Sequence, residues 1–289
     1  MRDLLTLHEI GAEGVAEILA LSESADLGAP LAGKGVALVF EKPSARTRNS
    51  MEMAVKQLGG HPIYIQKDEV GIDTRETAED VARTLACYHG VIAARVMDHD
   101  HLTRMAAAVD TPVLNMLSDT DHPLQGLADL LTIKQLVGRL GGARVAYVGD
   151  GNNNVAKSLA EGCALTGAEL VIASPEEFQL AAPPAGVRQV VSPAEAVAGV
   201  QVVYTDVWVS MGQAEETARR NAALAPYQVD EALMALTDDA WFLHCLPARR
   251  GEEVDAAVID GPRSGVWRQA ENRMHTARGA LAWMVGAST

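Results

Sequence analysis

The chain has 289 residues, a formal net charge of −14 and 48% hydrophobic residues. This length suffices for one large domain or two medium ones, each with its own core. The acidic balance argues against nucleic-acid binding, so an anionic ligand would need a local group of arginines. No apolar run approaches the ~20 residues of a membrane span, and the first residues lack an apolar signal core. We therefore predict a cytoplasmic protein without a membrane segment.

The cysteines, Cys87, Cys163 and Cys245, are few, odd in number and free of CxxC spacing. This pattern argues against a disulfide framework and against a zinc knuckle.

Short β-branched runs alternate with stretches of helical periodicity along the whole chain. Such alternation predicts parallel sheets covered by helices on both faces. The predicted strands are residues 36–40, 61–65, 91–94, 113–115, 145–148, 170–173, 202–205 and 241–243.

A division into two parts is predicted near residue 136. The helix expected over residues 124–138 ends at Gly138 and is followed by Gly141 and Gly142, which is typical of a helix stop and a new start. We predict an α/β protein of two doubly wound parallel-sheet domains, residues 1–135 and 136–266. The last helix, about residues 267–289, is expected to pack back onto the first domain. Parallel sheets of this kind bind ligands at the carboxyl ends of their strands, so functional residues are expected there.

The first predicted strand leads into the segment from Ser44 to Arg48. Ser44 and Thr47 can cap the following helix, and a helix N-terminus flanked by Arg46 and Arg48 can bind an anion such as phosphate. An ordinary capped helix with two solvated arginines fits the same pattern. Arg95 ends the third strand and would point to the same edge, or would form a surface salt bridge.

His122 and Gln125 flank Pro123 at the expected start of the long helix. A neutral histidine and an amide there can polarise a carbonyl and orient an NH₂ group. A histidine that only caps the helix is the alternative.

The fifth strand ends in Gly149-Asp-Gly-Asn-Asn-Asn154. A dinucleotide site is disfavoured because the third glycine of GxGxxG and the acid after the next strand are missing. Asn154 could instead bind a carboxylate. Asp206 follows a later strand and suits a cationic amine, or caps a turn.

His244, Cys245 and Leu246 follow the last predicted strand. A thiol beside a histidine and arginines could have its pKa pulled below the usual ~8.5, although a lone cysteine is also a small buried apolar residue. Arg273 lies on the last helix and could reach the anion. The segment from Asp98 to His101 lacks metal-ligand spacing and is expected to be a solvated loop.

Together these stretches resemble the aspartate/ornithine carbamoyltransferase family, in the same order along the chain. Ser-Ala-Arg-Thr-Arg resembles its carbamoyl-phosphate loop, and His122-Pro-Leu-Gln125 its H-P-x-Q motif. The segments at Asp206 with Ser210-Met211-Gly212, at His244-Cys-Leu-Pro247, and at Glu271-Asn-Arg273 are similar to the ornithine branch.

The resemblance implies transfer of the carbamoyl group from carbamoyl phosphate to L-ornithine, which gives L-citrulline and phosphate in arginine metabolism. It implies an active site in the cleft between the domains, a homotrimer, and no metal or cofactor, because carbamoyl phosphate is already activated. It assigns carbamoyl phosphate to Ser44, Ala45, Arg46, Thr47, Arg95, His122, Gln125, Cys245, Leu246 and Arg273. It assigns ornithine to Asn154, Asp206, Ser210 and Met211, with Cys245, Arg95 and His122 as the catalytic residues.

Three departures from the family pattern stand out. Ala45 replaces the usual threonine of the phosphate loop and removes one hydroxyl donor. Glu69 replaces a frequent glutamine, and a carboxylate near a dianion must point away or be paired. Residues 175–191 are shorter than is typical, which suggests a trimmed outer loop. The alternatives are a carbamoyltransferase for another amine, such as putrescine or an N-acylated ornithine, and a non-catalytic paralogue; a dehydrogenase is a distant third.

Overall fold

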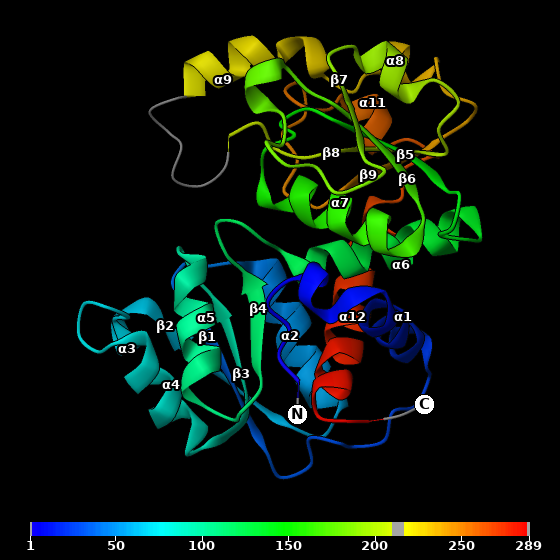
Figure 1. Ribbon diagram of the computed structural model, residues 1–289. Helices are drawn as coiled ribbons and strands as arrows, with labels where there is room; N and C mark the ends of the chain where they lie inside the picture. Colours follow the sequence, from blue (N-terminus) through cyan, green and yellow to red (C-terminus); the bar gives the residue numbers. More distant parts are fainter. Residues whose placement is uncertain (1, 210–216, 288–289) are drawn as a thin grey trace. The chain divides into compact units, whose positions relative to one another are not determined.

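The computed structural model describes residues 2–209 and 217–287, and the chain folds as two compact units (Figure 1). Unit 1 comprises the residues up to Ala128 and those from Asn272 onward, and unit 2 comprises Asp129–Glu271. Each unit is a parallel α/β sheet with helices, as the alternating pattern predicted.

The sheet of unit 1 has the strand order β2-β1-β3-β4, and every neighbouring pair is parallel. Its central strands are buried, which explains their nearly continuous runs of Val, Ile, Leu and Ala. The edge strand β2 alternates between exposed and half-buried residues. The strands are β1 (Gly35–Phe40), β2 (His61–Gln66), β3 (His89–Arg95) and β4 (Val113–Leu117).

Helices cover both faces of this sheet. Figure 1 shows α4 and α5 on one side and α1, α2 and α12 on the other. On the α4/α5 side, Val81 and Leu102 pack in one core with Val39 and Ile92 of the strands. The helices are α1 (Leu7–Glu23), α2 (Ala45–Gln57), α3 (Lys67–Val70), α4 (Ala78–Ala86), α5 (His99–Ala108), the start of α6 (Pro123–Val137) and most of α12 (Val266–Met284).

The sheet of unit 2 has the order β7-β6-β5-β8-β9 and is again parallel throughout. The segment 175–191, expected as a trimmed outer loop, includes the short edge strand β7, which was not predicted. The strands are β5 (Arg144–Val148), β6 (Glu169–Ala173), β7 (Arg188–Val190), β8 (Val202–Thr205) and β9 (Trp241–His244).

Two apolar cores lie on the two faces of this sheet. Tyr147 and Tyr204 pack with α7 on one face, and Val148 and Phe242 pack with α11 on the other. The helical segments are α7 (Asn154–Thr166), η1 (Glu176–Phe178), α8 (Pro193–Val197), α9 (Thr217–Leu224), η3 (Ala225–Tyr227), α10 (Glu231–Met234) and α11 (Ala256–Ile259). Over residues 2–209 and 217–287, no helix combines the length and apolar character needed to cross a membrane.

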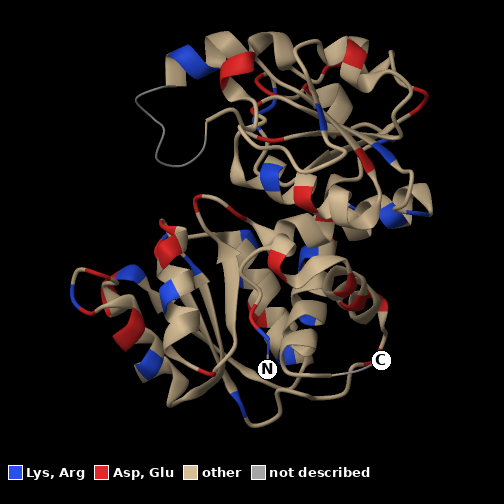
Figure 2. Ribbon diagram, in the orientation of Figure 1, with Lys and Arg blue, Asp and Glu red and all other residues tan. Residues whose placement is uncertain are grey.

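Both strand orders reverse direction at a point that matters for function. In unit 1 the chain moves from β1 out to β2 and returns to β3 on the other side; in unit 2 the reversal lies between β5 and β8. Sheets of this type bind ligands at such switch points, beyond the carboxyl ends of the strands. Charged residues lie mainly on the helices and in the connecting segments (Figure 2). The next question is which of them lie at these strand ends.

Candidate functional site

The turn from β1 into α2 places polar groups at the switch point of unit 1. Ser44 is the N-cap of α2, and its hydroxyl accepts a hydrogen bond from the Thr47 N–H at 3.3 Å. The Thr47 side chain is buried, and its hydroxyl meets two arginines instead of capping the helix. The cap therefore rests on Ser44 alone.

Two buried guanidinium groups converge on the Thr47 hydroxyl. Arg95, the last residue of β3, donates from Nη1 at 3.5 Å, and Arg273 of α12 donates from Nη2 at 3.4 Å. Both contacts are long for N–H···O hydrogen bonds. Arg273 also donates from Nη1 to the Gln125 side-chain oxygen. Four residues predicted for one ligand, from four separate segments of the chain, are thus in contact.

His122 lies beside these arginines and immediately precedes α6. Burial lowers its pKa well below 6.5, and the charges of Arg273 and Arg95 lower the pKa further. The imidazole is therefore neutral at pH 7, with one donating and one accepting nitrogen. This is the protonation state in which a histidine can donate to an oxygen without adding a charge.

The remaining residues of the α2 turn point elsewhere. Ala45 begins the helix, and Arg46 is exposed in its first turn. Among the described residues, no contact joins Arg46 to Arg95 or His122. Arg48 pairs with Glu52 at 2.7 Å and stacks on the ring of Tyr64, and its part in phosphate binding stays a prediction.

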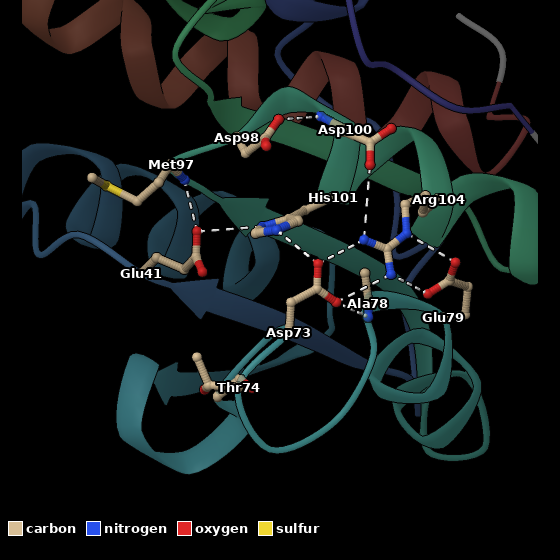
Figure 3. A network of polar contacts seen from close by, with 11 residues as sticks. Glu41, Asp73, Thr74, Ala78, Glu79, Met97, Asp98, Asp100, His101 and Arg104 are labelled. Carbon is tan, nitrogen blue, oxygen red and sulfur yellow. Dashed lines mark hydrogen bonds and ion pairs between the residues drawn. The ribbon is translucent and has the colours of Figure 1, made fainter.

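Glu41 follows β1 and contacts the segment after β3 (Figure 3). Its N–H donates to the Arg95 carbonyl at 2.9 Å, and its carboxylate accepts from the Met97 N–H at 2.7 Å. His101 Nδ1 lies 3.7 Å from the same carboxylate. These contacts hold the backbone from the Arg95 carbonyl to residue 97.

The segment from Asp98 to His101, expected as a solvated loop, is a helix start. Asp98 caps α5, and His101 Nε2 lies 3.3 Å from Asp73 (Figure 3). Arg104 donates to both oxygens of Asp73 and of Glu79, and this lowers the pKa of Glu79 to about 2. The segment therefore starts a helix instead of forming a solvated loop. Its His101 belongs to an ion-pair network with Asp73 and Arg104.

Glu69 has a hydrogen-bond partner at the start of its own short helix. Its carboxylate accepts from the Gln66 N–H at 2.6 Å and so caps its own short helix α3. The expectation that this acid is paired or directed away is met within unit 1.

In unit 2 the turn after β5 forms the corresponding switch point. Gly149 has φ +130°, and a Cβ there would lie 3.3 Å from Thr205 Oγ1, so the turn requires glycine. Asn153 caps α7 by accepting from the Val155 and Ala156 N–H groups at 2.9 and 2.8 Å. Asn154, predicted to bind ornithine, is the first residue of that helix.

A buried ion pair that we did not predict from the sequence holds this turn. Arg220 of α9 donates to Asp150, which follows Gly149, and its Nε donates to the Trp208 carbonyl at 2.8 Å. Burial raises the pKa of Asp150, while the charge of Arg220 opposes that rise. The segment after β8 and the turn after β5 are thus joined through one guanidinium.

Asp206 and Cys245 meet at the ends of β8 and β9. The Cys245 thiol donates to Asp206 Oδ1 at 3.0 Å, and the Val207 N–H donates to the same oxygen at 2.8 Å. Burial raises the pKa of Asp206 although these hydrogen bonds oppose the rise. The thiol therefore lies beside a carboxylate, and a ring nitrogen of His244 lies within 4.8 Å of its sulfur, as the sequence order predicted.

The ring of His244 supports the residue next to this thiol. Its Nδ1 accepts from the Leu246 N–H at 2.8 Å, so Nε2 carries the proton and donates to Glu253 at 3.1 Å. The ring and the Glu253 carboxylate are fully buried. Leu246 has φ +60°, an uncommon conformation for a leucine.

Asp206, His244 and Cys245 also form the one described group whose ligand atoms, within 4.8 Å of one another, could hold a metal ion. Both nitrogens of His244 and the thiol already have hydrogen-bond partners. A metal there would have to displace at least one of them.

The predicted residues therefore form two groups, each within its own unit. Thr47, Arg95, His122, Gln125 and Arg273 gather in unit 1, and Asp206 and Cys245 with the neighbouring turn in unit 2. Ser210 and Met211 lie outside the described residues.

Comparison with known proteins matches both units. The carbamoyl-P binding domain of the aspartate/ornithine carbamoyltransferase family matches residues 2–135, and its Asp/Orn binding domain matches residues 141–284. A protein of Hyperthermus butylicus named ornithine carbamoyltransferase is 47% identical over 97% of this chain and 96% of its own length.

Solved structures give the same picture. Ornithine carbamoyltransferase from Pyrococcus furiosus superposes with a TM-score of 0.91 at 40% identity, covering 97% of this chain and 96% of that one. The Thermus thermophilus enzyme superposes with a TM-score of 0.89 at 41% identity, covering 98% of each chain.

Proposed function

The chain belongs to the aspartate/ornithine carbamoyltransferase family, and from this premise we propose that it transfers the carbamoyl group of carbamoyl phosphate to L-ornithine. The δ-amine attacks the carbonyl carbon, the bond from that carbon to the phosphate oxygen breaks, and phosphate leaves with the electron pair. The products are L-citrulline and phosphate, and one proton leaves the amine.

Residues 1–135 would bind carbamoyl phosphate with help from Arg273. The convergence of Arg95 and Arg273 on Thr47, beside a neutral His122, is the observation that carries this proposal. Guanidinium groups bind phosphate and carboxyl oxygens through paired N–H donors. The capped start of α2, with Ser44, Ala45 and Arg46, adds backbone N–H groups.

The carbonyl oxygen gains negative charge as the amine attacks. Arg95, Thr47 and His122 are the donors that we assign to this oxygen, and Gln125 would orient the carbamoyl NH₂. Fixed donors stabilise the transition state more than the ground state, because the charge develops only there. The contacts of Glu41 with the backbone at 95 and 97 would keep one of these donors in place.

Residues 136–266 would bind ornithine. Asp206 is buried, and burial raises its pKa, so a cation beside it would stabilise its charged form. The α-ammonium group of an amino acid would supply that cation. Asn154 at the start of α7 would bind the α-carboxylate, and Ser210 and Met211 complete the assignment by resemblance.

Cys245 would orient the amine by accepting a hydrogen bond from it, without forming a covalent intermediate. Its thiol already donates to Asp206, so it can turn its sulfur lone pairs towards an approaching ammonium group. An alkyl ammonium has a pKa near 10 and must lose a proton before attack, which desolvation next to cations favours. Leu246 would line the place where the ligands react.

A colorimetric citrulline assay with carbamoyl phosphate tests the proposal. We expect citrulline from ornithine, and little product from putrescine or N-acetylornithine. Arg95→Ala should abolish most activity, whereas Arg83→Ala, which removes an exposed arginine of unit 1, should retain it. No phosphate release with any amine would contradict the proposal, and a preference for another amine would replace ornithine in it.

A place in arginine biosynthesis, a cytoplasmic location and a homotrimeric assembly are further parts of the proposal, supported by the family resemblance. Light scattering coupled to size-exclusion chromatography tests the assembly: a mass near that of three 30.6 kDa chains, or a multiple of it, is expected.

A further inference from the structure

The buried side chain of Gln269 holds the strand end that carries the thiol. Its Oε1 accepts from the backbone N–H of His244 at 2.9 Å, and its Nε2 donates to Asp129 Oδ1 at 2.6 Å. Asp129, Gln269 and His244 are all at most 1% exposed, and all three belong to unit 2. The thiol of Cys245 is therefore one residue away from a fully buried side-chain anchor.

The anchor lies on the open edge of the sheet. β9 is an edge strand, paired with β8 on one side only. On its other side, the Phe242 N–H donates to the Arg263 carbonyl, and the Gly265 N–H donates to the Phe242 carbonyl, both at 2.8 Å. The next outward-facing N–H is that of His244, and Gln269 satisfies it in place of a further strand.

The two partners fix the orientation of the Gln269 amide. The His244 N–H can only donate, and an ionised Asp129 can only accept, so the amide oxygen must face one and the NH₂ group the other. Asp129 is fully buried, and its Oδ1 lies 2.6 Å from the Gln269 Nε2, where it accepts from the amide. A carboxylate in place of the amide would therefore face a second carboxylate inside the protein, which is strongly unfavourable.

We propose that Gln269 is a positioning residue that sets the Cys245 thiol against Asp206, and that Asp129 orients it. The inference rests on the proposed function, in which that thiol and that carboxylate receive ornithine. Displacement of the His244 backbone would change the 3.0 Å contact between Cys245 and Asp206. It would leave the carbamoyl-phosphate residues of unit 1 with their own hydrogen bonds.

A charge-swap experiment tests this role. Gln269→Glu should lower kcat/KM for ornithine by about tenfold or more, as expected for a lost buried hydrogen bond, with the Kd of carbamoyl phosphate changed less than about twofold. Adding Asp129→Asn restores an amide opposite the carboxylate, with its NH₂ group donating to Glu at 269. The double variant should recover ornithine kcat/KM to within about threefold of the wild type.

A second readout does not depend on turnover. Alkylation by iodoacetamide, quantified by mass spectrometry, compares Cys245 with the exposed Cys87 in the same molecule. The ratio of the two rates should change in Gln269→Glu and return in the double variant. If Gln269→Glu does not fold, the proposal requires that the double variant folds and shows the wild-type ratio of the Cys245 and Cys87 alkylation rates.

The outcomes separate the two proposals. A wild type that makes no citrulline overturns the proposed function, while the alkylation ratio still tests the positioning role. Unchanged ornithine kinetics and an unchanged ratio in a folded Gln269→Glu protein overturn the positioning role. A double variant whose ornithine kcat/KM is no higher than that of Gln269→Glu also overturns the positioning role.

Discussion

Replacement of Arg220 by methionine should destabilise unit 2, because it leaves Asp150 buried without its cation. The side chains of this pair are 7% and 3% exposed. Removing one partner of such a pair costs about 3–5 kcal/mol, since the other charge stays buried and uncompensated. The hydrogen bond from Arg220 to the Trp208 carbonyl is lost as well and falls within this figure, because the values are not additive.

The loss should depend on pH in a defined direction. Burial already raises the pKa of Asp150 above its ordinary 3.8, and without Arg220 the pKa should rise further. The folded variant then holds a proton that the unfolded chain releases near pH 4, so stability falls as the pH rises above that value. The deficit should be larger at pH 8 than at pH 5, and Asp150→Asn in the Arg220→Met background should remove this difference.

Urea unfolding followed by tryptophan fluorescence measures the effect, because Trp208, Trp241 and Trp267 all lie in unit 2. Arg188→Met is the matched control: its pair with Glu195 is about half exposed and should be worth at most about 1 kcal/mol. An Arg220→Met protein no less stable than this control, or a double variant no more stable than the single one, would refute the reasoning.

Three further predictions concern the substrate groups. Below pH 6.5 the unfolded chain binds a proton at His122 that the folded protein does not bind, because burial lowers the pKa of this residue. The free energy of unfolding of the wild type, measured by urea titration, should therefore fall below pH 6.5 by up to about 1.4 kcal/mol per pH unit. His122→Asn should make this fall smaller. Arg46→Ala should raise KM for carbamoyl phosphate far more than KM for ornithine, with Arg48→Ala as the milder control; equal losses in both constants would remove Arg46 from its role. Cys245→Ala should raise ornithine KM and slow turnover while calorimetry still detects carbamoyl-phosphate binding, and Cys87→Ala should change neither.

The sequence pattern predicted most of the fold, because buried parallel strands leave apolar runs that are easy to recognise. All eight predicted strands are present, and the long helix begins at Pro123 as expected. The missed strand β7 has only three residues, Arg188–Val190, and lies at the sheet edge. A short edge strand needs no apolar run, so periodicity could not indicate it.

The candidate site was predictable only as a set of side chains after strands. The order of the motifs along the chain indicated that Thr47, Arg95, His122 and Arg273 belong to one site. It did not indicate that Arg95 and Arg273 both donate to the Thr47 hydroxyl. Arg220 was missed because its partner is 70 residues away and a helical arginine is usually solvated. A buried ion pair leaves no local signal in either segment.

The surroundings of Cys245 could be predicted only in part. A ring nitrogen of His244 lies within 4.8 Å of the thiol sulfur, as adjacency in sequence suggested. The same ring also bonds Glu253, and Arg250 pairs with Asp260. The strand register places Asp206 beside the thiol, and register follows from the fold, not from adjacency along the chain.

The electrostatic character of the two units gives the deepest reason for the assignment. In unit 1 the pKa of His122 is lowered by burial and by two arginines, which marks a positive potential at the end of the sheet. In unit 2 burial raises the pKa of Tyr147, and the charges of Asp206 and Asp150 raise it further, which marks a negative one. A protein with a net charge of −14 does not gain a buried positive site by chance, since burying charge costs several kcal/mol. A dianion and an ammonium ion are the ligands that would each offset this cost, and a carbamoyl transfer from phosphate to an amino acid uses one of each.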